Sequence, residues 1–303
     1  MSTAEVFALD IGTRKIAGLL LAASEGGFEL QHAVVEQQLP GAMADGQIHH
    51  IEAVAKVIRK IKQQLEQACG RTLQRAAVAA AGRSLRTQLG VSTAAFPRHH
   101  RFSADEVRAL ELDAVRDAVE QLNPDSGGGV MHSYLCVGYS VTQYYLDGER
   151  IGSLVDHQGT SAKAEVIATF LPRVVIDSLD TALERADLEM LSLTLEPIAA
   201  MHVVVPPTMR MLNIALVDVG AGTSDLAISA GGTVKAYGMI SYAGDAMTTG
   251  LAEHFLLDFT VAEQVKLSLQ PNQAVKCLDV FGNELNLAYE DVVAVLKPRV
   301  EAL

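Results

Sequence analysis

The sequence predicts an α/β protein with two lobes, each of which begins with a hairpin whose first strand ends in an aspartate. Two distant stretches of the 303-residue chain, Ala8–Thr13 and Val217–Thr223, are imperfect copies of one another. Each has a short apolar run, an aspartate, a turn of small residues and a second apolar run, which is typical of a strand that turns tightly and returns. The first half adds a strand–strand–strand–helix–strand order, which predicts a mixed sheet with helices packed on it.

The first lobe is predicted to occupy residues 1–83 and to resume at 173–206. Apolar residues at three- and four-residue spacing predict an amphipathic helix from Ile51 to Ala68, which Gly70 ends. Pro197 stands at the first position of a later helix, where its missing N–H costs nothing. The remaining predicted elements are strands at Val6–Leu9, Ile16–Ala23, Phe28–Val35, Ala76–Ala81 and Leu188–Leu195, and helices at Val174–Ala186 and Ile198–Val205.

Residues 84–172 are predicted to form a small inserted α+β subdomain. Ser103 and Glu106 form a capping box, which opens a helix that runs through Leu122. The composition of residues 123–129 predicts a loop. Tyr134–Leu146 alternates as a strand does, and the Asp147-Gly148 pair that follows is a strong hairpin signal.

The second lobe is predicted over residues 207–303, after a hinge-like break at Pro206-Pro207. It repeats the strand pattern of the first lobe and then becomes helical. The predicted strands are Leu212–Val217, a strand around Ile228, and Val234–Ile240; the predicted helices are Ala246–Phe255, Val261–Leu269 and Tyr289–Val300.

Composition and charge narrow the class of protein. Hydrophobic residues make up 49% and charged residues 20% of the chain, as in an ordinary globular protein. The net charge of −12 argues against binding to nucleic acid. No signal peptide is visible, and the apolar runs are shorter than the ~20 residues of a membrane helix, so we expect a cytoplasmic protein.

The cysteines and paired histidines do not predict a metal site. Cys69, Cys136 and Cys277 have no metal-ligand spacing, which favours reduced thiols in a cytosolic protein. His99 and His100 are adjacent and flanked by arginines, which favours a solvated basic loop.

The twin turns predict a site for a phosphorylated ligand. Glycine lets backbone N–H groups approach an anion closely, and Thr13 and Thr223 add hydroxyl donors. An aspartate beside a polyphosphate would repel it, so its role must be toward a divalent cation and its waters. A single such turn is usually an ordinary one, but a chance turn has no reason to recur with the same flanking hairpin. Lys15 either neutralises phosphate charge or is simply a solvated strand end.

The chain resembles the actin-like ATPases, and within that superfamily it most resembles the bacterial cell-division FtsA family. The motifs that carry the resemblance are Asp10–Lys15, Gly41–Gly46, Ala79–Gly82, Val217–Asp225, Ile240–Asp245 and Ala262–Lys266. The position of the inserted subdomain, directly after Gly82, is the most diagnostic feature. The resemblance implies a two-lobed fold with mixed five-stranded sheets. It also implies binding of ATP and Mg²⁺, assembly into filaments, and a link between the tubulin-like division protein FtsZ and the inner face of the cell membrane.

The resemblance assigns roles to individual residues. Asp10 and Asp218 match the acids that hold water around Mg²⁺. Residues that would cradle the phosphates are Gly12, Thr13, Gly220, Gly222 and Thr223, and Gly244 and Asp245 form the later glycine–acid turn. Glu263 and Lys266, which lie one helical turn apart, match positions that contact the nucleoside, although such a pair is by itself usually a surface ion pair.

Glu196 lies where actin-like ATPases place a side chain that orients water. Its carboxylate could align water on the γ-phosphate and accept its proton, which would make it catalytic together with Asp10 and Asp218. The alternative is an acid that the helix dipole favours at a helix N-terminus. An acid here departs from many FtsA sequences and leans toward MreB or the pilus protein PilM. The implied activity is at most a weak ATPase, and a PilM-like nucleotide-binding scaffold of a pilus or other membrane assembly is the alternative function. A third function, phosphorylation of a small molecule, would require a substrate-binding insertion and a general base at the cleft, and the sequence shows neither.

Two family features are missing from the sequence. No glycine-rich turn that would close over adenosine follows Ala288, and the chain ends at Leu303 without the linker and amphipathic membrane helix of FtsA. We therefore expect a second lobe that is incomplete at its C-terminal end, in a truncated chain or a shortened homologue. Membrane attachment would require a C-terminal segment that is absent here.

Overall fold

The fold was analysed in a computed structural model, which describes residues 5–25, 27–81, 84–123, 133–206, 208–231 and 233–303. The predicted loop at 124–129, Gly82 and Pro207 therefore lie outside the described residues. The chain divides into two compact units: unit 1 runs to Asp218 and resumes over Asp225–Met239, and unit 2 comprises Val219–Ser224 and Ile240–Leu303. Each unit is described separately.

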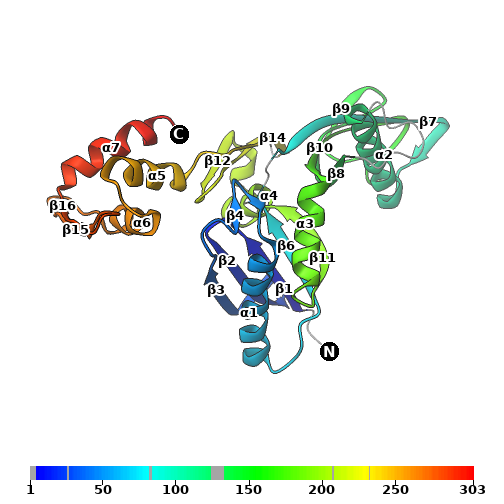
Figure 1. The fold of residues 1–303 in the computed structure, drawn as a ribbon. Helices are drawn as coiled ribbons and strands as arrows, with labels where there is room; N and C mark the ends of the chain where they lie inside the picture. The colour runs from blue at the N-terminus through cyan, green and yellow to red at the C-terminus, as the bar shows by residue number, and fades with distance from the viewer. Residues whose placement is uncertain (1–4, 26, 82–83, 124–132, 207, 232) are drawn as a thin grey trace. The chain divides into compact units, whose positions relative to one another are not determined.

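The core of unit 1 is a mixed five-stranded sheet, as predicted for the first lobe. Its strands are β1 (Glu5–Ile11), β2 (Lys15–Ser24), β3 (Gly27–Gln37), β6 (Arg75–Ala80) and β11 (Glu189–Leu195), in the order β11-β6-β1-β2-β3 (Figure 1). β1 and β2 form the predicted hairpin, in which Ile11 pairs with Ile16. β6 lies parallel to β1 and to β11. Strands buried in the middle of a sheet need apolar residues on both faces, which is why β6 is almost entirely alanine and valine.

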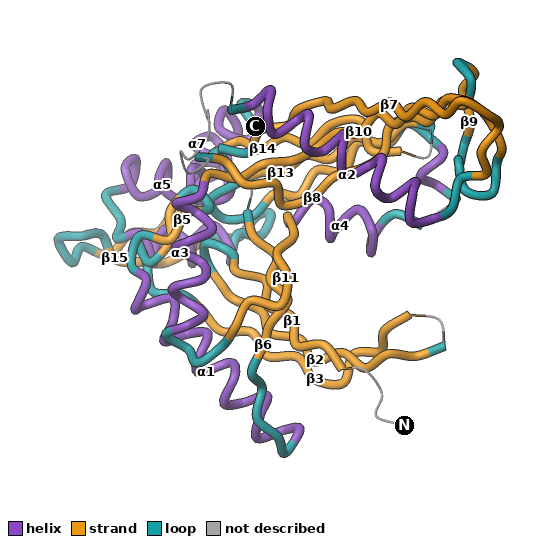
Figure 2. Tube along the Cα trace, turned by 90° about the vertical axis from the view of Figure 1, so that its right-hand side faces the viewer, coloured by secondary structure: helices purple, strands orange, loops and turns teal. Residues whose placement is uncertain are grey.

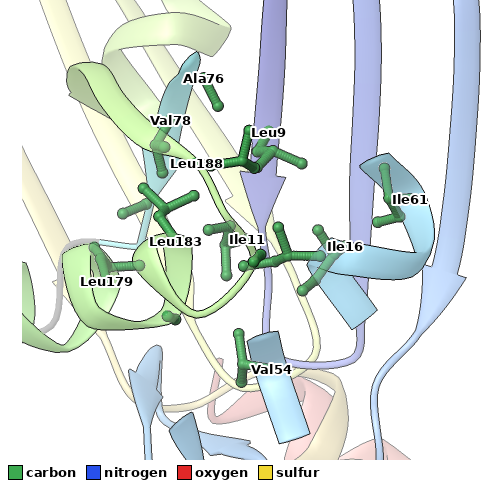
Figure 3. Packing of buried hydrophobic residues seen from close by; sticks show 14 of the residues in the cluster. Leu9, Ile11, Ile16, Val54, Ile61, Ala76, Val78, Leu179, Leu183 and Leu188 are labelled. Atoms are coloured by element: carbon green, nitrogen blue, oxygen red, sulfur yellow. The ribbon is translucent and has the colours of Figure 1, made fainter. Parts of the chain in front are cut away.

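Helices α1 (Ile51–Cys69) and α3 (Arg173–Glu184) pack side by side, and α1 covers β2 and β3. The α1 stripe Val54, Ile58, Ile61 and Leu65 is fully buried, as its spacing predicts. Figure 3 shows these helices and the β1–β2 hairpin contributing to one apolar cluster. Gly70 ends α1 in the left-handed conformation, with φ 70°, which glycine adopts without strain. A two-residue ladder, β4 (Met43–Ala44) with β5 (Gln47–Ile48), precedes α1.

The inserted subdomain is an antiparallel sheet beside one helix. Its strands are β7 (Arg86–Arg101), β8 (Tyr134–Leu146), β9 (Glu149–Ile151) and β10 (Gln158–Pro172), in the order β7-β10-β8-β9, and α2 (Ala104–Leu122) lies against them (Figure 2). The Ser103 capping box is present and opens α2. The prediction of a basic loop at His99 and His100 was wrong, because both belong to β7. His100 stacks on Phe96 with ring centroids 4.4 Å apart.

The strands after α4 (Glu196–Val204) and a 3₁₀ turn, η1 (Met209–Met211), form a three-stranded sheet. β12 (Ile214–Val219), β13 (Ser224–Ala230) and β14 (Thr233–Ile240) lie in the order β12-β13-β14. Met201 and Val205 pack against Ala227 and Tyr237 of this sheet. The contacts therefore join most of this sheet to unit 1, whereas the sequence predicts a domain boundary at 207.

Unit 2 is mainly helical. It contains α5 (Gly244–Phe255), α6 (Phe259–Ser268) and α7 (Tyr289–Glu301), with a hairpin of β15 (Val275–Leu278) and β16 (Glu284–Leu287). Its core includes Leu251, Ala262, Val265, Leu287 and Val292. Throughout the described part of the chain, no helix combines the length and the apolar character needed to pass through a bilayer.

Candidate functional site

The first turn is held rigidly at the end of β1. Gly12 makes a close approach: a Cβ added there would lie 3.2 Å from the carbonyl oxygen of Lys15. Gln38 ties the turn to the rest of unit 1, because its Nε2 donates to the Gly12 carbonyl at 2.7 Å and its backbone N–H donates to the Arg14 carbonyl at 2.9 Å. Thr13 is half-buried and Lys15 is exposed.

The second turn has the same local geometry. The Gly220 N–H donates to the Thr223 carbonyl at 2.9 Å, and a Cβ at Gly220 would lie 3.2 Å from that oxygen. Gly220 therefore corresponds to Gly12, and Thr223 corresponds to Lys15. Thr13 and Thr223 occupy different positions in their turns, so the two hydroxyls are not equivalent by structure. Gly222 and Thr223 are buried.

Three predicted acids are close enough in unit 1 to repel one another. Burial and the neighbouring Asp218 carboxylate raise the pKa of Asp10, against a smaller opposing effect of Lys15. Burial raises the pKa of Glu196 well above its ordinary value, and repulsion from Asp10, Asp225 and Asp218 adds to the shift. The structure thus brings Asp10, Asp218 and Glu196 together.

Glu196 is the first residue of α4, as expected for an acid at a helix N-terminus. The helix dipole would stabilise its ionised form and lower its pKa. The pKa moves the other way, so burial and the surrounding carboxylates outweigh the dipole. The Oε1 atom is buried and has no hydrogen-bond partner among the described residues. A buried oxygen without a partner is costly in a protein with nothing bound, which is a common property of functional sites.

The acids fit a hard cation bound through water. Carboxylate oxygens are the ligands that Mg²⁺ prefers, and Mg²⁺ usually keeps several of its waters. In the described part of the chain, no three His, Cys, Asp or Glu side chains converge to ligate a metal directly. The mutual repulsion of these carboxylates is what a divalent cation would relieve.

One hydrogen-bonded network in unit 2 joins five of the predicted residues: Gly220, Thr223, Gly244, Glu263 and Lys266. The backbone N–H groups of Gly244 and Asp245 donate to the carbonyls of Gly220 and Ala221, at 3.1 and 2.7 Å. Lys266 and Glu263 form an ion pair at 2.7 Å, with side chains only 19% and 17% exposed. This pair is therefore not a solvated surface pair.

The predicted site residues thus fall into two groups, one in each unit. Unit 1 holds Asp10, Gly12, Thr13, Lys15, Glu196 and Asp218, and unit 2 holds Gly220, Gly222, Thr223, Gly244, Asp245, Glu263 and Lys266. Sequence reasoning assigned no role to Asp225, Gln38 or Thr248. Asp225 stands at the end of the second motif, which was a usable signal. Gln38 and Thr248 carry no signal in the sequence.

Comparison with characterised proteins confirms the resemblance to FtsA. The chain is 23% identical over 263 residues to the cell division protein FtsA of Pseudomonas aeruginosa, covering 86% of this chain and 60% of that protein. FtsA of Escherichia coli K12 is 24% identical over the same length and with the same coverage. The chain thus spans about 60% of the length of these relatives. No protein-family model matches it.

Solved structures confirm the actin-like ATPase fold. A PilM–PilN type IV pilus biogenesis complex superposes with a TM-score of 0.68 at 16% identity, covering 99% of this chain and 74% of that one. MreB5 of Spiroplasma citri, solved with ADP, gives a TM-score of 0.52 at 13% identity, covering 99% and 76%. At such low identity these likenesses show the fold alone.

Proposed function

We propose that this chain binds Mg·ATP and acts as an actin-like assembly protein of bacterial cell division. The observation that carries the nucleotide proposal is the pair of matching glycine turns, each following an aspartate, of which Asp10 and Asp218 lie close enough to repel. The division proposal rests on the similarity to FtsA. Nucleotide binding and the division role are both proposals, because the likeness to solved structures shows the fold alone.

In this proposal the turn glycines and Thr13, Lys15 and Thr223 hold the phosphates, because close backbone N–H groups and cationic or hydroxyl donors suit an anion. Glu263 and Lys266 hold the nucleoside end, together with the Gly244-Asp245 turn. Asp10 and Asp218 accept hydrogen bonds from water around the metal. A bound Mg²⁺ would supply charge neutralisation at the phosphates.

Glu196 would act on the attacking water. The raised pKa favours the protonated form of Glu196, which cannot accept a proton, and positive charge in the acid cluster would lower this pKa and favour the carboxylate. Such a base would support a slow ATPase that is active only when Mg·ATP is bound.

The cellular role follows from the same proposal. The protein would self-associate into filaments in the cytoplasm, bind an FtsZ-like division protein, and act at the inner face of the cell membrane. Nucleic acid is not a proposed partner, given the net charge of −12.

The test of nucleotide binding is titration calorimetry with Mg·ATP on the wild type and Asp218→Ala. Loss of an outer-shell ligand typically costs a metal site about 10–100-fold in affinity, and we expect a loss of that size. Asp113→Ala is the matched control: Asp113 is an exposed acid on α2 paired with Arg116, and its removal should leave affinity unchanged. Equal affinities for wild type and Asp218→Ala would refute the proposal.

The PilM-like scaffold stays an alternative prediction, because the structural likeness to PilM shows only the fold. Pull-down separates the two roles. Capture of an FtsZ-like protein supports the division role, and failure with FtsZ alongside binding to an inner-membrane pilus protein supports the scaffold.

A further inference from the structure

Thr248 bonds to three members of the unit 2 network, namely Gly244, Glu263 and Lys266. It is fully buried in α5, one turn after Gly244. Its hydroxyl lies 2.8 Å from Lys266 Nζ, 3.0 Å from the Gly244 carbonyl oxygen, and in a short hydrogen bond with Glu263 Oε2. A buried hydroxyl with three polar neighbours is strongly fixed in position.

The protons of this network can be assigned from donor and acceptor capacity. The Lys266 ammonium has three N–H groups, and it has three acceptors: Glu263 Oε2 at 2.7 Å, Thr248 Oγ1 at 2.8 Å and the Gly244 carbonyl at 3.0 Å. Thr248 has one proton to donate, and the Glu263 carboxylate is a stronger acceptor than a carbonyl because it is charged. Thr248 therefore accepts from Lys266 and donates to Glu263, bridging the two charges.

The network continues from Gly244 into the second glycine turn. While its carbonyl accepts from Lys266, the Gly244 N–H donates to Gly220, and a Cβ at Gly244 would lie 3.1 Å from the Gly220 carbonyl oxygen and 3.4 Å from Lys266 Nζ. A side chain at position 244 would crowd both groups, so glycine suits this close approach. The Glu263–Lys266 pair and the turn that contains Gly220 are thus parts of one rigid frame.

We propose that Thr248 is a positioning residue of the nucleotide site. It fixes the side chains of Glu263 and Lys266 through its hydroxyl, and it keeps Lys266 bonded to the Gly244 carbonyl that leads to the second turn. The ligand class is a nucleoside triphosphate with Mg²⁺, so this proposal rests on the proposed function. Thr248 itself acts only through its neighbours.

The test compares Thr248→Val, which keeps the shape and removes the hydroxyl, with Thr248→Ser, which keeps the hydroxyl. Thr249→Val is the matched control, because Thr249 is the next residue of α5 and is exposed. The first measurement needs no nucleotide: the rate at which an amine-acylating reagent modifies Lys266, read by mass spectrometry. The second measurement is the affinity for Mg·ATP by calorimetry. Circular dichroism confirms that each variant is folded.

We expect Thr248→Val to acylate several-fold faster at Lys266 and to bind Mg·ATP about 10-fold more weakly, the size expected for a lost hydrogen bond to a charged group. Thr248→Ser should restore both values, and Thr249→Val should change neither. Unchanged acylation in Thr248→Val, with wild-type binding intact, overturns the role of Thr248 alone. If the wild type binds no Mg·ATP, the proposed function fails and the nucleotide role of Thr248 fails with it, whatever the acylation rates.

Discussion

Replacing Glu196 with glutamine tests whether burial and neighbouring acids destabilise the ionised Glu196 carboxylate in the ligand-free protein. The amide has nearly the same shape as the carboxyl group but cannot ionise. Burial and three neighbouring acids raise the pKa of Glu196 above its ordinary value of 4.5. Folding therefore favours the protonated form of this side chain.

The sign and size of the effect follow from linkage between protonation and folding. A raised carboxyl pKa contributes stability that is fully present below the unfolded value and is lost as pH rises through the folded value. Between those two values, wild-type stability falls by about 1.4 kcal/mol for each pH unit, relative to a variant that cannot ionise at this position. Glu196→Gln should therefore match the wild type below about pH 4.5 and exceed it by a margin that grows with pH until the folded pKa of Glu196 is passed, after which the margin stays constant.

The assay is urea denaturation at several pH values followed by circular dichroism, because the chain contains no tryptophan. Hydrogen exchange at β1 and β6 amides assigns the change to unit 1. Glu36→Gln is a control of opposite sign: hydrogen bonds from Lys60 and Gln64 lower the pKa of Glu36. That variant should lose stability at neutral pH, and the loss should vanish in acid. If the unfolding free energies of wild type and Glu196→Gln differed by the same amount at every pH, folding would not raise the pKa of Glu196 and the reasoning would be refuted.

Two further predictions concern the inserted subdomain. Ser103→Ala removes the hydroxyl that accepts from the Glu106 N–H, and the loss of such a cap should cost about 1 kcal/mol of unfolding free energy, measured by urea denaturation. Gly90→Ala would drive a Cβ into the Ala114 carbonyl of α2 and should cost about 1–3 kcal/mol, since backbone cannot move aside cheaply. Gly152→Ala is its control, as open space surrounds that position, and a similar loss in both glycine variants would contradict the packing argument.

Local patterns predicted most of the elements, and the failures have physical causes. The α1 stripe, the Ser103 capping box and the β1–β2 hairpin all rest on interactions within a few residues, which sequence spacing encodes. Strands β7 and β10 were not predicted. β7 contains Pro97 and two histidines, and it is stabilised by pairing with β10, more than 50 residues later along the chain. Such pairing depends on partners that local sequence does not reveal.

The residues of the candidate site likewise divide into those that local motifs predicted and those that only the structure revealed. The twin motifs identified Asp10 and Asp218 and the glycines of both turns, because a short turn after a strand is a local structure. Thr248 and Gln38 could not be predicted from the sequence, because the role of a buried threonine or glutamine depends on the groups that it contacts in the folded protein.

The sequence by itself determined the α/β class, the two acid-tipped hairpins and the resemblance to the actin-like ATPases, because repeated motifs and periodic apolar residues act at short range. Only the tertiary structure decided that the Oε1 atom of Glu196 is buried close to other acids. It also decided that the Lys266 ammonium donates to Glu263, Thr248 and Gly244. Burial and electrostatic repulsion depend on distances through space, and residues far apart in the chain set those distances only after it has folded.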